Sequence, residues 1–206
     1  MARDVNKLAE PHLGSQQGAC KILISGAFCT GKTTLCSALS RAVEATGLRA
    51  SVVSESARRC PYPLHSRQTP SSSAWLVGEQ MKAEVEAMAG GNGIVICDRG
   101  VPDILAHLRT AMAAEATGDR LASVVSNICF QWTKTYDMIF MTQPVPDRPI
   151  RRDGFRRWGK VKQIETHKAL LSIMKSLMVV AILLPNADDE RLLIIGGMLG
   201  LLEGDA

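Results

Sequence analysis

The 206-residue sequence lacks a long uninterrupted apolar run, a paired-cysteine pattern and a strong net charge. The longest apolar stretch, residues 169–184, is interrupted by Ser172, Lys175 and Ser176, so it falls short of the roughly 18 to 20 apolar residues that span a bilayer. The net charge of +4 is too small to imply nucleic-acid binding by itself, because that interpretation needs basic residues clustered on one face. No membrane role is implied.

The six cysteines are scattered at spacings that match neither a C-x-x-C metal pair nor a small disulfide scaffold. Reduced thiols in a cytoplasmic protein are the simplest explanation. Hydrophobic residues at 46% and charged residues at 21% are ordinary for a globular protein. The first 18 residues are polar and contain Pro11, Gly14 and Gly18, so we expect residues 1–19 to form a flexible leader and residues 20–206 a single domain.

The apolar pattern alternates between strands and helices. Short β-branched runs predict strands at residues 21–25, 50–54, 94–97, 136–141 and 179–184. Apolar residues at helical spacing predict helices at residues 32–46, 75–89, 101–116, 120–134 and 188–202. Residues 59–73 hold three prolines and three consecutive serines, which predicts a surface loop. This alternation is typical of a three-layer α/β domain built on a parallel sheet.

Residues 26–33 carry the strongest chemical signal. They read Gly-Ala-Phe-Cys-Thr-Gly-Lys-Thr, which fits G-x-x-x-x-G-K-[ST] at every fixed position, between a predicted strand and a predicted helix. Glycines let successive backbone N–H groups point at phosphate oxygens, and the following helix adds its positive end. Lys32 is expected to reach the β- and γ-phosphates, and the Thr33 hydroxyl to ligate Mg²⁺. The candidate nucleotide-binding residues of this loop are Gly26, Thr30, Gly31, Lys32, Thr33 and Thr34.

A second carboxylate is expected beside this loop. Asp98 ends the strand at residues 94–97, and the carboxyl ends of parallel strands share one edge of a sheet. Asp98 is therefore a candidate second residue of the Mg²⁺ site, although it could instead cap the helix that begins near Pro102. Arg99 is positioned to neutralise phosphate charge or to pair with an acid.

The acceptor side is predicted from the strand at residues 50–54, which is followed by Glu55. A hydroxyl acceptor needs a base or an orienting carboxylate, and Glu55 is the candidate, with Arg58 as a further candidate acceptor-binding residue. A surface ion pair of Glu55 to Arg58 or Arg59 is the alternative. Gln80 and Glu84 lie one helical turn apart and either meet the acceptor together or form a solvated helix face.

Residues 147–162 form a basic segment with a net charge of +5, from seven basic and two acidic residues. Arginines pair well with phosphate oxygens, so we expect a lid at about residues 144–162 that closes over the γ-phosphate. Binding of nucleic acid or exposure to solvent are the alternatives for this segment.

Several motifs in a fixed order resemble those of P-loop kinases of the nicotinamide-riboside-kinase-like AAA-type group, which are neighbours of the deoxynucleoside and thymidylate kinases. They are the phosphate loop, Glu-x-x-Arg at residues 55–58, Gln80 with Glu84, Asp-Arg-Gly-x-x-Asp at residues 98–103, Tyr136-Asp137 and Asp-Gly-x-Arg at residues 153–156. The resemblance implies a five-stranded parallel sheet in the order 2-3-1-4-5. It also implies that Arg156 of the lid approaches the phosphates and that the loop at residues 185–187, with Asn186, lies near the adenine.

Together these observations predict an ATP-dependent kinase that transfers the γ-phosphoryl group to a hydroxyl of a small molecule, most simply a nucleoside-like one. ATP and Mg²⁺ are the expected cofactors, GTP is an alternative donor, and a homodimer is compatible with the sequence. An antibiotic or specialised metabolite is an alternative acceptor. A regulatory NTP-binding ATPase module without an acceptor, or a kinase of RNA or DNA 5′-hydroxyls, are the alternatives from other classes.

Overall fold

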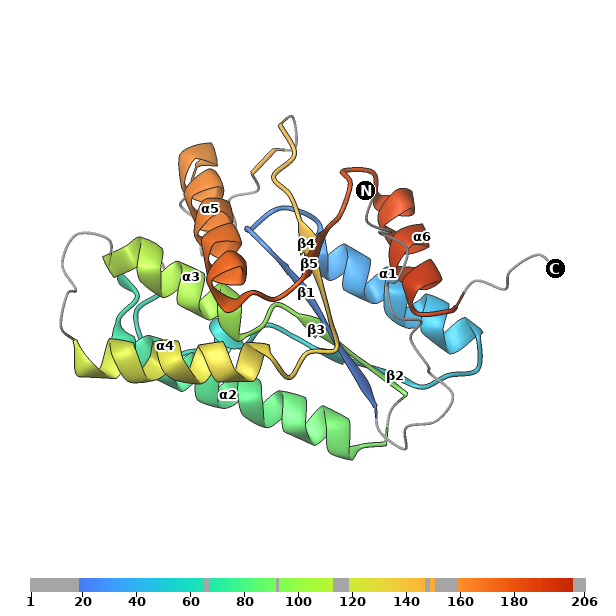
Figure 1. Ribbon diagram of the computed structural model, residues 1–206, viewed down its shortest axis with the longest axis horizontal. Helices are drawn as coiled ribbons and strands as arrows, with labels where there is room; N and C mark the ends of the chain where they lie inside the picture. The colour runs from blue at the N-terminus through green and yellow to red at the C-terminus, as the bar shows by residue number, and fades with distance from the viewer. Residues whose placement is uncertain are drawn as a thin grey trace, which may run out of the picture.

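The computed structural model describes residues 19–64, 67–91, 93–112, 119–146, 149–150 and 159–201. Its centre is a five-stranded parallel sheet with the strand order β2-β3-β1-β4-β5, which confirms the predicted order (Figure 1). The strands are β1 (Cys20–Gly26), β2 (Ala50–Val53), β3 (Ile94–Asp98), β4 (Met138–Thr142) and β5 (Ala181–Leu183).

Helices cover both faces of the sheet (Figure 1). One face is covered by α1 (Lys32–Ala45) and α6 (Asp188–Met198), and the other by α2 (Pro70–Ala89), α3 (Val101–Met112), α4 (Arg120–Thr133) and α5 (Lys160–Leu177). Side chains alternate along β1, so Ile22 and Ile24 pack into the core under α1, whereas Leu23 packs into the opposite core. All three are fully buried, as expected for a parallel strand covered on both faces.

Helix α2 begins earlier than predicted. The expected loop at residues 59–73 follows a short 3₁₀ helix, η1 (Ser56–Arg59), and ends at Thr69, because α2 starts at Pro70 rather than near Trp75. Thr69 and Ser72 form a capping box, and Pro70 occupies the first helical turn, where its missing N–H is not needed. The serines that suggested a loop are therefore the start of a helix.

Helix α5 was not predicted from the sequence at all. Its inward face alternates apolar residues such as Leu170 and Ile173 with the polar Gln163 and Thr166, all of them buried. The polar members interrupt the helical spacing of apolar residues, and that interruption hid the helix. Elsewhere the differences are confined to element ends.

The predicted lid is described only in part, at residues 144–146, 149–150 and 159–162. Residues 147–148 and 151–158, including Arg156, lie outside the described residues. Lys160 begins α5, and its Nζ donates to the carbonyl of Val145 at 2.7 Å and to that of Pro146. The two ends of the segment are therefore held together. In the described part of the chain, no helix is long and apolar enough to cross a membrane.

Candidate active site

The phosphate loop lies where β1 ends and α1 begins, at the carboxyl edge of the sheet. Gly26 has a φ of 142°, and a Cβ at this position would meet both the side chain and the carbonyl of Thr142 on β4. Gly31 precedes α1 in the left-handed conformation, with a φ of 90°. Both positions require glycine, because an L side chain is strained at these angles. The sequence motif therefore reflects backbone geometry that the neighbouring strand enforces.

Lys32 is folded back into the loop. Its side chain is buried, and Nζ donates to the carbonyl of Ala27 at 2.5 Å and to Thr30 Oγ1 at 3.5 Å. Burial, together with the nearby positive charge of Arg99, lowers the pKa of Lys32 to about 7. A polyphosphate in the loop would supply the anionic partner that favours the charged ammonium.

Thr33 and Asp98, the two residues expected to hold Mg²⁺, lie in contact beside the phosphate loop. Thr33 Oγ1 donates to Asp98 Oδ2 at 2.6 Å. The other carboxylate oxygen, Oδ1, is buried and has no hydrogen-bond partner among the described residues. Hard oxygen ligands of this kind suit Mg²⁺, which takes its remaining ligands from phosphates and water. The two residues fit the expected metal site, and Asp98 bonds the phosphate loop rather than capping α3.

Asp103 connects the phosphate loop to the start of α3. Its Oδ1 accepts from the Gly26 N–H at 3.2 Å, and its Oδ2 accepts from the Gly100 N–H at 3.1 Å. Burial raises the pKa of Asp103, while Arg99 and Lys32 act in the opposite direction. The sequence singled out Asp103 only as the last residue of the Asp-Arg-Gly-x-x-Asp motif. In the structure this spacing lets its carboxylate bridge the N–H groups of Gly26 and Gly100.

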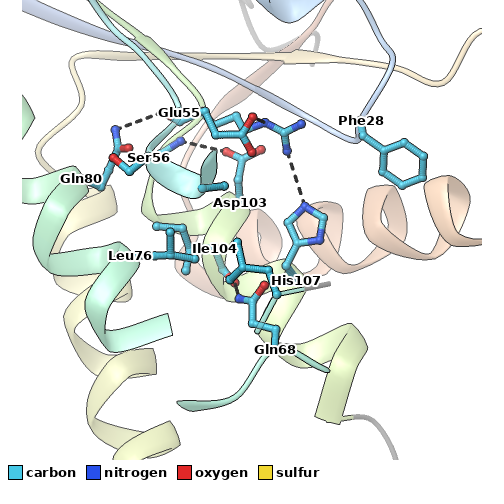
Figure 2. A pocket seen from close by; sticks show the side chains of 13 residues that line it. Phe28, Glu55, Ser56, Gln68, Leu76, Gln80, Asp103, Ile104 and His107 are labelled. Carbon is cyan, nitrogen blue, oxygen red and sulfur yellow. Dashed lines mark hydrogen bonds and ion pairs between the residues drawn. The ribbon is translucent and has the colours of Figure 1, made fainter. Parts of the chain in front are cut away.

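A pocket opens directly beside the loop, and Phe28 of the loop forms part of its wall (Figure 2). Its lining combines apolar side chains with two carboxylates and an arginine. The lining residues are Phe28, Glu55, Ser56, Ala57, Leu64, Gln68, Leu76, Gln80, Arg99, Gly100, Asp103, Ile104 and His107. A largely apolar wall with a few polar groups is the usual character of a small-molecule site.

Glu55 and Arg99 face each other in this pocket. Arg99 Nε lies 3.2 Å from Glu55 Oε2, and Arg99 Nη1 lies 3.5 Å from His107 Nε2 (Figure 2). Burial opposes the charge of Arg99, but the carboxylates, Glu55 first, raise its pKa. The sequence left a surface ion pair to Arg58 or Arg59 open as the alternative for Glu55. In the structure Arg99 is a partner of Glu55, and Arg58 is exposed and outside the pocket lining.

Glu84 does not reach the pocket, contrary to the prediction that it meets the acceptor. Its side chain is fully buried, and its carboxylate accepts hydrogen bonds from four groups. These are Lys21 Nζ at 3.0 Å, Trp132 Nε1 at 2.7 Å, the Tyr136 hydroxyl at 2.7 Å and Gln80 Nε2 at 2.9 Å. Gln80 lines the pocket, but its Nε2 is used for Glu84 and for the Arg99 carbonyl at 3.2 Å. The solvated helix face is equally excluded, because both side chains are buried.

Arg191 is a site residue that the sequence analysis missed. Its fully buried side chain donates from Nη1 to the Thr30 carbonyl in the phosphate loop at 2.9 Å, and from Nε to the Pro185 carbonyl at 2.6 Å. It thereby joins the loop that follows β5 to the phosphate loop. Asn186, predicted to lie near the adenine, is exposed on that connected loop. No local motif surrounds Arg191, so the sequence offered no signal for it.

The family model described as an AAA domain matches residues 21–191, which span the strands, the phosphate loop and Arg191. The chain belongs to the AAA domain family. A search of curated proteins found no match. This AAA domain carries the P-loop and the three-layer architecture expected from the sequence.

Solved structures support the same fold for this AAA domain. NadR protein in complex with NAD and AMP-PNP superposes with a TM-score of 0.70 at 15% identity, over 91% of this chain and 52% of that chain. NadR with NR gives 0.67 at 16% identity, over 91% and 54%. Deoxyadenosine kinase from M. mycoides, with the products dCMP and dCDP, gives 0.64 at 11% identity, over 88% and 100%. The AAA domain thus spans about half the length of the NadR structures.

Proposed function

We propose that this AAA domain is an ATP-dependent phosphotransferase that moves the γ-phosphoryl group to a hydroxyl of a small, nucleoside-like molecule. The observation that carries the proposal is the pocket that adjoins the phosphate loop and contains the Glu55–Arg99 pair. A loop that only binds or hydrolyses a nucleotide needs no second pocket with an apolar wall beside it. The known ligands of the similar structures, AMP-PNP for NadR and deoxynucleotides for deoxyadenosine kinase, are consistent with this assignment.

The donor side is formed by the loop and by β3. Lys32 neutralises the β- and γ-phosphates, and Thr33 with Asp98 holds the Mg²⁺. When bound, the metal would neutralise part of the negative charge on the phosphates. The Arg191 bridge fixes the Thr30 carbonyl and so helps to hold the conformation of the loop. Transfer of a phosphoryl group depends mainly on such positioning and on electrostatic stabilisation.

The acceptor side is formed by Glu55, Arg99 and the apolar wall. The body of the acceptor packs on Phe28, Leu76 and Ile104, which direct its hydroxyl toward the loop. Glu55 orients that hydroxyl or takes its proton, and Arg99 holds Glu55 and faces the transferred group. Arg156 of the lid, outside the described residues, is proposed to add a further positive charge over the γ-phosphate.

The test is transfer of label from γ-labelled ATP into a metabolite extract, read by mass spectrometry. Glu55→Gln keeps the shape of the side chain but removes the base, so transfer should fall by about 10²-fold or more while ATP affinity stays within a few-fold. Glu86→Gln, on an exposed carboxylate of α2, is the matched control and should leave transfer unchanged. Transfer that survives in Glu55→Gln would refute the assigned role.

The same assay separates the alternatives. A regulatory ATPase would give hydrolysis with no phosphorylated product from any metabolite pool. A nucleic-acid kinase would label oligonucleotides, and its binding would weaken steeply with salt. An antibiotic or specialised metabolite as acceptor would appear as a labelled product outside the nucleoside fraction.

A further inference from the structure

Arg99, the arginine on the proposed acceptor side, has an unusual backbone conformation. Arg99 has a φ of 74°, in the left-handed region that residues with a side chain seldom adopt. Its N–H donates to the Ile24 carbonyl at 3.1 Å, and its own carbonyl accepts from Gln80 Nε2 at 3.2 Å. The turn is thus held at both its amide and its carbonyl. A conformation that costs of order 1–3 kcal/mol persists only when its surroundings fix it.

The orientation of Gln80 is itself fixed. Its amide nitrogen faces two groups that can only accept, the Arg99 carbonyl and Glu84 Oε1, so the nitrogen and oxygen of the amide cannot exchange places. Glu84 is fixed in turn. Two donors satisfy Oε1, Gln80 and Tyr136, and two satisfy Oε2, Lys21 and Trp132.

The charge of this cluster is balanced inside the protein. Lys21 Nζ is 3.0 Å from Glu84 Oε2 and lies 4.7 Å from the ring centroids of both Trp132 and Tyr136. Both members of the ion pair are buried, with side chains 5% and 0% exposed. Buried ion pairs contribute little net stability compared with apolar residues, so their presence calls for another explanation.

The cluster around Glu84 also lies against Gly100, the residue that follows Arg99 in the turn. A Cβ on Gly100, the residue after Arg99, would meet the hydroxyl of Tyr136, which is bonded to Glu84. The Arg99-Gly100 turn therefore lies against the cluster along two consecutive residues. We propose that Gln80 and Glu84 are positioning residues that hold Arg99 in its left-handed turn and so present its guanidinium to Glu55. This role rests on the proposed function, because it concerns the acceptor side of the same site.

Gln80→Met is the appropriate test, because methionine has a similar length and volume but cannot donate to the Arg99 carbonyl. We expect kcat to fall about 10- to 100-fold, because displacements of about 1 Å at a reacting group have effects of this size. The KM for Mg·ATP should stay within about twofold, because Gln80 Nε2 donates to Glu84 and to the Arg99 carbonyl rather than to the phosphate loop. Glu86→Gln, on the exposed face of the same helix, is the control and should leave both parameters unchanged.

A purely structural role predicts a different result. In that case Gln80→Met would lower the melting temperature, but kcat measured well below that temperature would match the wild type, and the proposal would be overturned. A crystal structure of Gln80→Met gives a readout that does not depend on activity. The proposal requires Arg99 to leave the left-handed region, or Arg99 Nε to move beyond about 4 Å from Glu55 Oε2.

The two proposals fail in distinguishable ways. If the wild type phosphorylates nothing, the proposed function fails, and the crystal structure still decides the role of Gln80. If the wild type is active, and Gln80→Met is equally active with an unchanged Arg99 turn, only the positioning role of Gln80 fails. Glu84→Gln provides an independent variant, since its amide would place a donor against groups that already donate.

Discussion

Replacing Arg191 by methionine should destabilise the protein and weaken nucleotide binding together. Arg191 donates to the Thr30 and Pro185 carbonyls at 2.9 and 2.6 Å, and its side chain is fully buried. Each carbonyl left without a partner costs about 1–3 kcal/mol, and the apolar surface of methionine offsets part of this. The ion pair to Asp188 adds little, because Asp188 is 55% exposed. We therefore expect a loss of about 2–4 kcal/mol.

Urea unfolding followed by circular dichroism measures this loss directly. A decrease of about 2–4 kcal/mol corresponds to a melting temperature lower by about 4–16 °C for a chain of this length. Arg41→Met, at an exposed position of α1, is the matched control and should change stability by less than about 0.5 kcal/mol. If Arg191→Met costs less than about 1 kcal/mol and binds Mg·ATP as well as the wild type, the proposed bridge between the two loops is wrong.

Two further predictions concern packing and thiol chemistry. Gly100→Ala should lower the free energy of unfolding in urea by about 1–3 kcal/mol, because a Cβ would meet Tyr136 and approach Leu23 Cδ1 to 2.9 Å. Gly78→Ala in α2, where a Cβ would have nothing within 4 Å, is the control and should stabilise the protein by about 0.5–1 kcal/mol. Equal effects of the two substitutions would contradict the close packing at Gly100. Burial raises the pKa of the Cys36, Cys97 and Cys129 thiols, that of Cys129 to about 12, so they stay neutral at pH 8. Native protein treated with iodoacetamide at pH 8 should carry no label at these three positions by mass spectrometry, and labelling as fast as in urea would disprove this.

The parts of the site that sequence reasoning located are those defined by a contiguous motif or by a strand end. The phosphate loop is one continuous segment, so its residues and its glycine positions can be predicted from the sequence alone. Asp98 and Glu55 directly follow neighbouring strands, and parallel strands deliver their ends to one edge. The strand order followed from the resemblance to P-loop kinases, and the structure confirms it.

The parts that sequence reasoning missed depend on contacts between distant residues. Helical spacing correctly placed Gln80 and Glu84 on one face of a helix. It could not predict that Lys21, 63 residues before Glu84, is the ion-pair partner of Glu84. A lysine near the start of a buried strand gave no sign that it had a carboxylate partner. Arg191 lies 161 residues from Thr30 and is surrounded by no motif. Buried polar residues disguised α5 in the same way, since apolar spacing was the only criterion for a helix.

The residues of the proposed nucleotide site and most of the residues that line the pocket come from different elements of the fold. Lys32, Thr33 and Asp98 are brought together by β1, α1 and β3, at the edge of the sheet where the proposed nucleotide site lies. Apart from Phe28 of the loop, Glu55 and the apolar wall come from the segment after β2 and from α2 and α3, which surround the proposed acceptor side. Differences in acceptor among proteins with this architecture are therefore expected in these outer elements.

Titration calorimetry of the whole chain with Mg·ATP and Mg·GTP tests most directly whether the phosphate loop binds a nucleotide. We expect heat from a single site, a loss of most of the affinity when EDTA removes the metal, and little binding by Lys32→Ala, because each change removes a partner of the phosphates. Folded protein that gives no heat with either nucleotide would contradict the claim that residues 26–33 hold a polyphosphate.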